Sequence, residues 1–333
     1  MPSALTAARC SSRYAGTAEP GARPLDWVRR RWEAFWFAPQ SGLDLAIVRI
    51  VFFGGLLALH GSRDMSAVGE VPSLLWDPVS LFRWLPQPTA SVIQATQVVW
   101  RLALASAAVG LCTRAATGVA LVGGTLLLGL PPNLGAVRLD DAMIVPALCV
   151  MAMARCGDRL SVDRWLATRR DRAAGPPPLP RPSGEYTWPI RLVWVLMAMM
   201  YGGSGFAKLR MSGLAWLTSD HLARLLLQQH YGVEPPLLGI WGLAIAASPY
   251  LHHGLAVATL AVELAFPLAL LSARVRCVLV PAAYLMHVGI YLLVGVNFLG
   301  LVVLYAFWVP WERLAAIRGA AWSAAARSRA PQP

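Results

Sequence analysis

The feature that most constrains the fold is a series of apolar segments, each close to the length that crosses a lipid bilayer. A transmembrane helix needs about 20 predominantly apolar residues, and LAIVRIVFFGGLLALH is one of several segments near that length. Hydrophobic residues make up 57% of the chain and charged residues 14%. One soluble core cannot hide that much apolar side chain. The sequence therefore predicts a protein embedded in the lipid bilayer.

The predicted fold is an all-α, polytopic bundle of transmembrane helices, because the alternating strands of a membrane barrel are absent. We expect eight spans in one transmembrane domain, 43–310, and the expected spans are 43–61, 92–112, 116–132, 141–155, 188–207, 252–271, 278–295 and 297–310. The run 237–248 is short and is interpreted as re-entrant or interfacial. Nine spans result if it crosses.

The charge distribution predicts the orientation of the chain. The net charge is +12, and the arginines cluster at 9–31, 155–181 and 313–329, outside the apolar runs. Arginine flanks of this kind face the cytoplasm and anionic lipid, whereas a nucleic-acid groove interleaves them with aromatics, so no nucleic-acid partner is expected. The basic segment 1–42, which contains an expected interfacial helix at 26–36, and the basic tail 311–333 are both placed in the cytoplasm. No apolar signal-peptide core precedes the first span.

Lys208 is the strongest candidate for chemistry. It is the only lysine among 29 basic residues and lies in the stretch GGSGFAKLR, at the end of a long apolar run. Arginine stays protonated at any ordinary pH, whereas a desolvated lysine can become a neutral base. The alternative is an amine that reaches the headgroups as an anchor. Because arginine fills that role elsewhere in the chain, we favour the base.

Other ionisable residues are expected at membrane depth. Arg49 and Glu263 are costly if unpaired, so we predict that they form a buried structural charge network. His287, in YLMHVGIYLLVGVNF, is either a helix–helix hydrogen-bonding group or a proton-handling group. His252 and His253 are assigned to a cytoplasmic boundary as interfacial residues.

Two further expectations concern Asp140 and Asp141 and metal binding. The two aspartates open the fourth span on the side of Lys208, where paired carboxylates usually cap a helix. The five cysteines show no CxxC pair and no metal-ligand spacing, so no metal and no disulfide framework is expected.

Several segments look like one known family. These are LAIVRIVFFGG, YGGSGFAKLRMSGLAW, CGDRLSVDRW, LAVELAFPLALL and the span that holds His287, Gly295 and Phe298. With these segments taken in chain order, over about residues 40–310, the chain resembles the HTTM domain family, which includes the vitamin K-dependent gamma-glutamyl carboxylase. In CGDRLSVDRW, Ser161 and Asp163 match the family's Ser-Val-Asp segment.

The resemblance implies an enzyme of a bacterial cytoplasmic membrane that oxidises a lipid-soluble quinol. In the family's carboxylase, the lysine that matches Lys208 deprotonates reduced vitamin K, oxygen adds to the quinol, and glutamate is then carboxylated with carbon dioxide. Reduced vitamin K or another membrane quinol, oxygen and carbon dioxide are thus the implied substrates. Lys208 and His287 would be catalytic, and Trp216 and Tyr201 would line the substrate site.

The sequence departs from this pattern near the fourth helix. The carboxylase has a histidine there, whereas this chain has LDDAM, so that role is missing or belongs to Asp140 or Asp141 in the substrate site. Because few residues follow the last expected span, we expect no region for propeptide recognition, and any protein or peptide substrate is undetermined. The rival functions are a non-catalytic membrane scaffold and a transporter, the latter disfavoured by the absence of internal repeats.

Overall fold

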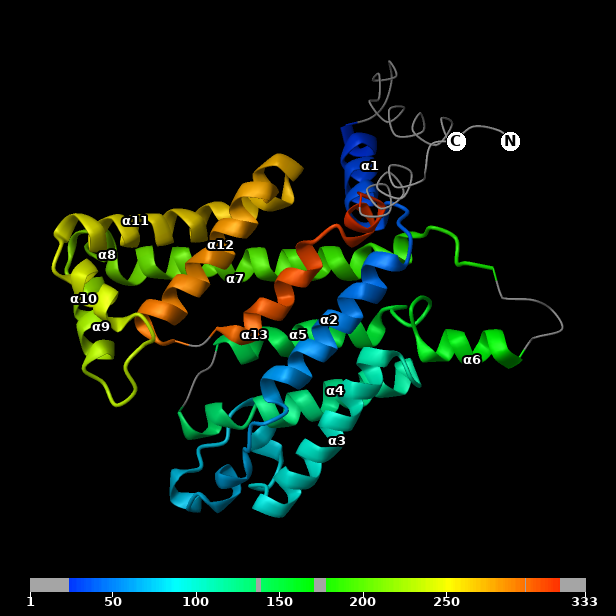
Figure 1. Ribbon diagram of the computed structural model, residues 1–333, viewed down its shortest axis with the longest axis horizontal. Helices are drawn as coiled ribbons and strands as arrows, with labels where there is room; N and C mark the ends of the chain where they lie inside the picture. The colour runs from blue at the N-terminus through cyan, green and yellow to red at the C-terminus, as the bar shows by residue number, and fades with distance from the viewer. Residues whose placement is uncertain (1–23, 136–138, 171–177, 297, 318–333) are drawn as a thin grey trace, which may run out of the picture.

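The computed structural model describes residues 24–135, 139–170, 178–296 and 298–317 (Figure 1). In these ranges the chain is helical, with one isolated bridge between Gln40 and Ser183 and no strand. The predicted all-α helical bundle is confirmed. The N-terminal residues 1–23 and most of the C-terminal tail lie outside the described residues.

Six helical segments are long and apolar enough to cross a membrane. They are built on α2 (Leu43–His60), α3 (Ala90–Val109), α4 (Thr113–Leu128), α7 (Trp188–Ser212), α11 (Pro249–Ala265) and α12 (Ala273–Val294). Short 3₁₀ turns extend three of them, namely η4 (Pro131–Leu134) after α4, η5 (Gly184–Tyr186) before α7 and η6 (Phe266–Leu270) after α11.

Two of the eight expected spans differ from the prediction. The fourth forms α5 (Leu139–Met153), which contains Pro146 and is shorter than a span. The eighth is broken into α13 (Leu299–Val302) and η7 (Val303–Trp308), and Gly300–Trp308 is bent by 65° from Trp311–Ile317. Counting that bent pair as one span gives seven. The run 237–248 forms only the eight-residue α10 (Gly239–Ala246), as its length predicted.

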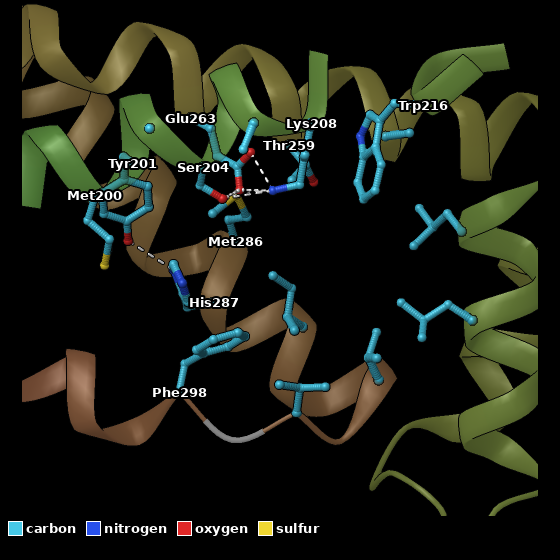
Figure 2. Close-up of a pocket in the computed structure, with 18 of the residues that line it drawn as sticks. Met200, Tyr201, Ser204, Lys208, Trp216, Thr259, Glu263, Met286, His287 and Phe298 are labelled. Atoms are coloured by element: carbon cyan, nitrogen blue, oxygen red, sulfur yellow. Dashed lines mark hydrogen bonds and ion pairs between the residues drawn. The ribbon is translucent and has the colours of Figure 1, made fainter. Parts of the chain in front are cut away.

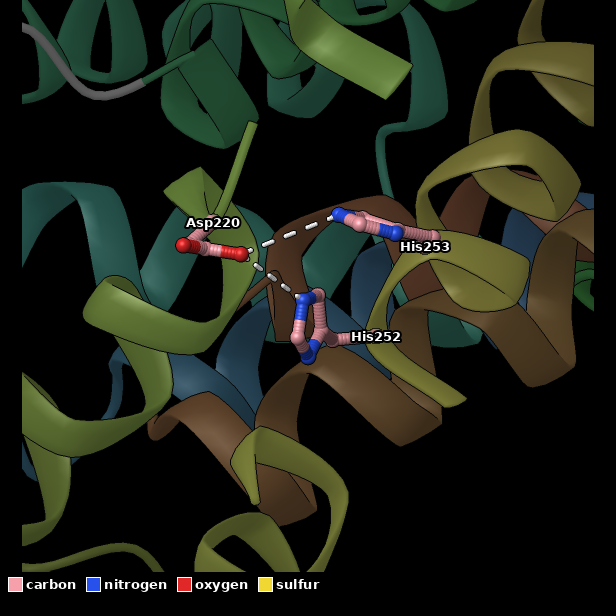
Figure 3. A group of neighbouring side chains, drawn as sticks. All are labelled: Asp220, His252 and His253. Atoms are coloured by element: carbon pink, nitrogen blue, oxygen red, sulfur yellow. Dashed lines mark ion pairs between the residues drawn. The ribbon is translucent and has the colours of Figure 1, made fainter. Parts of the chain in front are cut away.

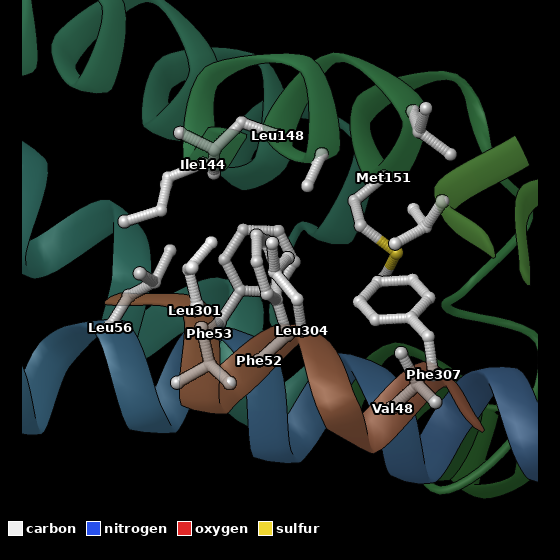
Figure 4. Packing of buried hydrophobic residues seen from close by; sticks show 14 of the residues in the cluster. Val48, Phe52, Phe53, Leu56, Ile144, Leu148, Met151, Leu301, Leu304 and Phe307 are labelled. Carbon is white, nitrogen blue, oxygen red and sulfur yellow. The ribbon is translucent and has the colours of Figure 1, made fainter. Parts of the chain in front are cut away.

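The centre of the bundle is an apolar layer in which α2, α5 and η7 meet (Figure 4). Phe52 and Phe53 of α2 are fully buried, and the Phe52 ring packs edge-on against Phe307 at 5.7 Å between centroids. All six residues of η7 are buried. A helix that is apolar and buried all round belongs in a core, so η7 packs inside the bundle and does not face lipid.

The elements at the two ends of the bundle do not span it (Figure 1). At one end lie α1 (Pro24–Phe37), which exposes Trp27 and Trp32 as expected for an interfacial helix, and α6 (Val162–Arg170). At the far end, α7 leads into α8 (Ala215–Thr218), α9 (His221–His230) and α10. The segment after α2 forms η1 (Ser66–Glu70), η2 (Ser73–Leu75) and η3 (Ser80–Trp84).

Arg49 does not pair with Glu263, so that prediction is wrong. The Arg49 guanidinium is fully buried and donates to the carbonyl oxygens of Cys156, Arg159 and Leu160 at 2.9, 3.4 and 2.5 Å. Backbone carbonyls carry a partial negative charge and satisfy several N–H donors at once. Arg49 therefore holds the loop after α5 against α2.

Asp163, in the first turn of α6, caps the start of α4. Its carboxylate accepts from Cys112 N at 2.7 Å, Thr113 N at 2.8 Å and Thr113 Oγ1 at 2.7 Å. Burial raises the pKa of Asp163, but these hydrogen bonds outweigh that effect, so its pKa lies below the ordinary value. Gly110 lies beside this cap and has a φ of +73°, which favours glycine. A Cβ at this position would also lie only 2.7 Å from an Arg49 nitrogen. The segment CGDRLSVDRW thus has a structural role at this end of the bundle.

Candidate functional site

The candidate site lies where one face of α7 meets α11 and α12 (Figure 2). Tyr201, Ser204 and Lys208 follow one another at helical spacings of three and four residues, which puts them on the same side of α7. Glu263 comes from α11 and His287 from α12. The site therefore joins residues that are far apart in the sequence.

Two glycines bring α7 close to the neighbouring segment. A Cβ at Gly205 would lie 3.0 Å from Leu264 and 3.1 Å from the Glu263 Cβ, and one at Gly202 would lie 2.9 Å from Pro267. Small residues allow helix backbones to approach in this way inside membranes. The GGSG stretch therefore sets the distance at which Lys208 and Glu263 meet.

Lys208 and Glu263 form a chelated ion pair. The Lys208 Nζ lies 2.5 Å from Glu263 Oε1 and 2.7 Å from Oε2, and it also donates to Ser204 Oγ at 3.0 Å. The side chains are 20% and 8% exposed. Ser204 Oγ in turn donates to Glu263 Oε1 at 3.2 Å. All three ammonium hydrogens therefore have acceptors inside the protein, which is not the geometry of an amine that reaches out to headgroups.

A second polar group lies beside the pair. His287 Nδ1 is 3.0 Å from the Ala283 carbonyl oxygen and 3.0 Å from the Tyr201 hydroxyl, which also hydrogen-bonds to Tyr305. A carbonyl oxygen only accepts, so its bond to the ring requires the proton on Nδ1. In the neutral ring the other nitrogen, Nε2, is then an acceptor. Tyr201 orients His287 and is 2% exposed.

These groups border a pocket of about 860 Å³. Its lining is mostly apolar and includes Met200, Met286, Ile290 and Phe298. Sites for lipophilic small molecules have this size and this pattern of apolar walls with few convergent polar groups. Figure 2 shows Lys208, Glu263, Tyr201 and His287 along one wall of it.

Trp216 forms another wall of the pocket. The Lys208 Nζ lies 5.2 Å from the centroid of the Trp216 ring, within range of a cation–π contact. The indole Nε1 is buried and has no hydrogen-bond partner in the part of the chain that the structure describes. A buried, unpaired N–H at a pocket wall is a donor that a ligand oxygen can satisfy.

The structure does not bring Asp141 to this pocket. Asp141 is 1% exposed, with one carboxylate oxygen 4.0 Å from His60 Nε2 and the other 3.6 Å from Arg63. It thus ties the start of α5 to the end of α2. The side chain of Asp140 lies outside the described residues.

Sequence reasoning missed two members of the site and gave a third the wrong partner. It assigned Glu263 to Arg49, and it did not single out Ser204 or Tyr305. Ser204 could have been found from its spacing of four to Lys208. Tyr305 could not, because its position depends on the break between α12 and η7.

Comparison of the chain with family models, with curated proteins and with solved structures finds no match.

Proposed function

We propose that this membrane protein is an enzyme that binds a lipid-soluble quinol and removes its proton with Lys208. The observation that carries this proposal is the Lys208–Glu263 pair, 2.5–2.7 Å apart, at the wall of a large apolar pocket. A flat, lipophilic ring with two hydroxyls fits such walls and offers oxygens to the polar groups. The unpaired Trp216 Nε1 is a donor for one of those oxygens.

The ion pair supplies the base in two steps. Glu263 first takes a proton from the Lys208 ammonium, which gives a neutral amine and a neutral carboxylic acid. Exclusion of water favours this uncharged form. The amine then accepts the quinol proton, and the new ammonium is paired with the quinolate. His287, held by Tyr201, positions the ring or relays a second proton.

The proposed turnover uses oxygen as the oxidant. One quinol and one O₂ give the quinone epoxide and water, the conversion that the HTTM resemblance implies. Coupling to carboxylation by carbon dioxide is part of the same proposal, with a protein or peptide acceptor of unknown identity. Reduced vitamin K is the first quinol to test.

The proposed location is a bacterial cytoplasmic membrane with both termini cytoplasmic. Contacts between distant segments support this orientation. Glu312 N donates to Asp44 Oδ1 at 2.6 Å, which puts the start of α2 and the end of the described chain at one end of the bundle. Arg276 lies 3.9 Å from the Trp194 ring near the start of α7, at that same end. Arg276 and Arg313, which directly follows Glu312, thus lie at one end, and this fits the positive-inside rule.

The test is quinone epoxide formation by the purified chain in lipid nanodiscs with oxygen and reduced vitamin K, followed by mass spectrometry. Lys208→Arg is expected to keep the ion pair and the fold but to lose epoxide formation, because arginine does not release its proton. Lys208→Ala is expected to regain some turnover with an added small amine. Arg210→Lys, at an exposed neighbouring position, is the matched control and keeps full activity.

Two results would refute the proposal. Full activity in Lys208→Arg would remove lysine from the chemistry. A folded wild-type chain that binds no quinol analogue and forms no epoxide would favour the non-catalytic scaffold. Binding is measured separately by quenching of tryptophan fluorescence.

A further inference from the structure

A cluster of metal-ligating side chains lies at the far end of the bundle, beyond the pocket (Figure 3). Asp220 precedes α9, and His252 and His253 lie in the first turns of α11. Asp220 Oδ1 is 3.3 Å from His252 Nε2 and 3.8 Å from His253 Nε2. All three ligand atoms lie within 4.8 Å of one another.

The burial of the three side chains differs in a way that suits a bound ion. The His252 side chain is 3% exposed, His253 34% and Asp220 71%. One ligand is therefore fixed by packing, and two are reachable from solvent. The sequence predicts a cytoplasmic boundary for the two histidines. They lie instead at the α8–α9 end of the bundle, where α7 ends with Lys208 in its last turns, and this is the end away from the start of α2 (Figure 1).

The ring nitrogens lack other partners. Neither nitrogen of His252, nor His253 Nε2, has a hydrogen bond within the described residues. Both imidazoles point Nε2 at the same Asp220 carboxylate oxygen, at 3.3 and 3.8 Å, yet neither makes a hydrogen bond to it. Neutral rings with the proton on Nε2 would leave both contacts weak, whereas one divalent ion between the three atoms would accept both Nε2 lone pairs and the carboxylate oxygen.

We propose that Asp220, His252 and His253 bind one divalent transition-metal ion of the zinc class. Zinc lies about 2.0–2.1 Å from imidazole nitrogen and carboxylate oxygen, so tetrahedral ligands are about 3.3 Å apart. The measured 3.3 and 3.8 Å fit that geometry with small side-chain movements. Two histidines and a carboxylate leave a fourth position open for water. This site is separate from the proposed quinol chemistry.

Bound metal would also fix the wall of the pocket. The Trp216 ring lies 5.0 Å from the His221 ring, and His221 directly follows Asp220. A metal that ties Asp220 to α11 therefore holds the α8–α9 segment against the helix that carries Glu263. Residue spacing does not indicate this site, because Asp220 lies far along the chain from the two histidines.

The test is metal binding by the full chain in detergent, purified through an affinity tag without histidine and stripped with EDTA. Zn²⁺ is titrated by calorimetry at pH 7.5, and Co²⁺ is added separately to record its visible absorption. We expect one Zn²⁺ per chain, a rise in the midpoint of thermal unfolding, and no binding of Mg²⁺, which prefers oxygen ligands.

Two partly exposed ligands give variants that should fold normally. Asp220→Asn and His253→Gln are each expected to weaken Zn²⁺ binding at least tenfold and to abolish the thermal shift. His230→Gln, at the other end of α9, is the matched control and binds as wild type. Zn²⁺ binding unchanged in both ligand variants, or absent from the folded wild type, would overturn the proposal. Equal binding of Mg²⁺ would overturn the assignment to zinc-class ions. None of these readouts depends on quinol turnover.

Discussion

Removing one partner of the Lys208–Glu263 pair should cost stability that removing both partly restores. Glu263→Gln leaves an ammonium facing an apolar pocket, and Lys208→Met leaves a carboxylate that is 8% exposed. Breaking a buried pair on one side costs about 3–5 kcal/mol, whereas replacing both members by apolar groups is nearly neutral. Because Lys208 is 20% exposed, we expect the lower value, about 3 kcal/mol, for each single change.

The assay is a double-mutant cycle on thermal unfolding in one detergent. At about 2 °C per kcal/mol, each single variant should lower the midpoint by roughly 6 °C. The double variant should lower it by less than the sum, which gives a coupling energy of about 2 kcal/mol or more.

A second cycle provides the control. Arg49→Met is expected to destabilise the chain through its three carbonyl contacts but to be additive with Glu263→Gln, since the two residues do not touch. Additive losses for Lys208 with Glu263, or coupling between Arg49 and Glu263, would refute the arrangement of charges described above.

Three further predictions test other parts of the structure. Asp163→Asn should cost about 1 kcal/mol at pH 7, as loss of a helix cap does. Because the folded pKa of Asp163 is lowered, its contribution is present above the unfolded value of about 3.9 and is lost as pH falls through the folded value, so wild type and variant should converge in acid denaturation. Gly205→Ala should be less stable than Gly203→Ala, since a Cβ at Gly205 meets Leu264 whereas Gly203 has open space; equal midpoints would refute the close packing of α7. Cysteines placed at Gly175 and Ser323 should both resist an impermeant reagent added to intact cells, and labelling of only one would rule out the even number of spans.

The sequence predicted the class of fold and its most unusual residue, but not the partners of buried charges. Apolar length alone identified the helices, and the single lysine led to the pocket wall. The choice between Arg49 and Lys208 as partner of Glu263 depends on helix rotation and depth, which a list of apolar segments does not contain. Arg49 instead donates to backbone carbonyls in a loop. Every residue has a backbone carbonyl, so the sequence does not indicate which of them accept from Arg49.

Span count was overestimated for a related reason. Hydropathy treats 141–155 and 297–310 as ordinary spans, whereas α5 has only 15 residues and Gly300–Trp308 ends at a 65° bend before Trp311–Ile317. Their apolar residues face protein rather than lipid, and composition does not distinguish these two environments.

The buried position of η7 has a consequence for how the chain is made. Phe52 and Phe53 belong to α2, yet Phe307 of η7, which packs against Phe52, is synthesised 255 residues after it. The contact between Asp44 and Glu312 joins positions 268 residues apart. The bundle therefore stays open at its centre throughout most of translation, because loop closure of this length precedes any gain from the contact. Release of the chain before η7 would expose this aromatic layer to cellular quality control, so a nonsense mutation that removes η7 should remove the protein entirely.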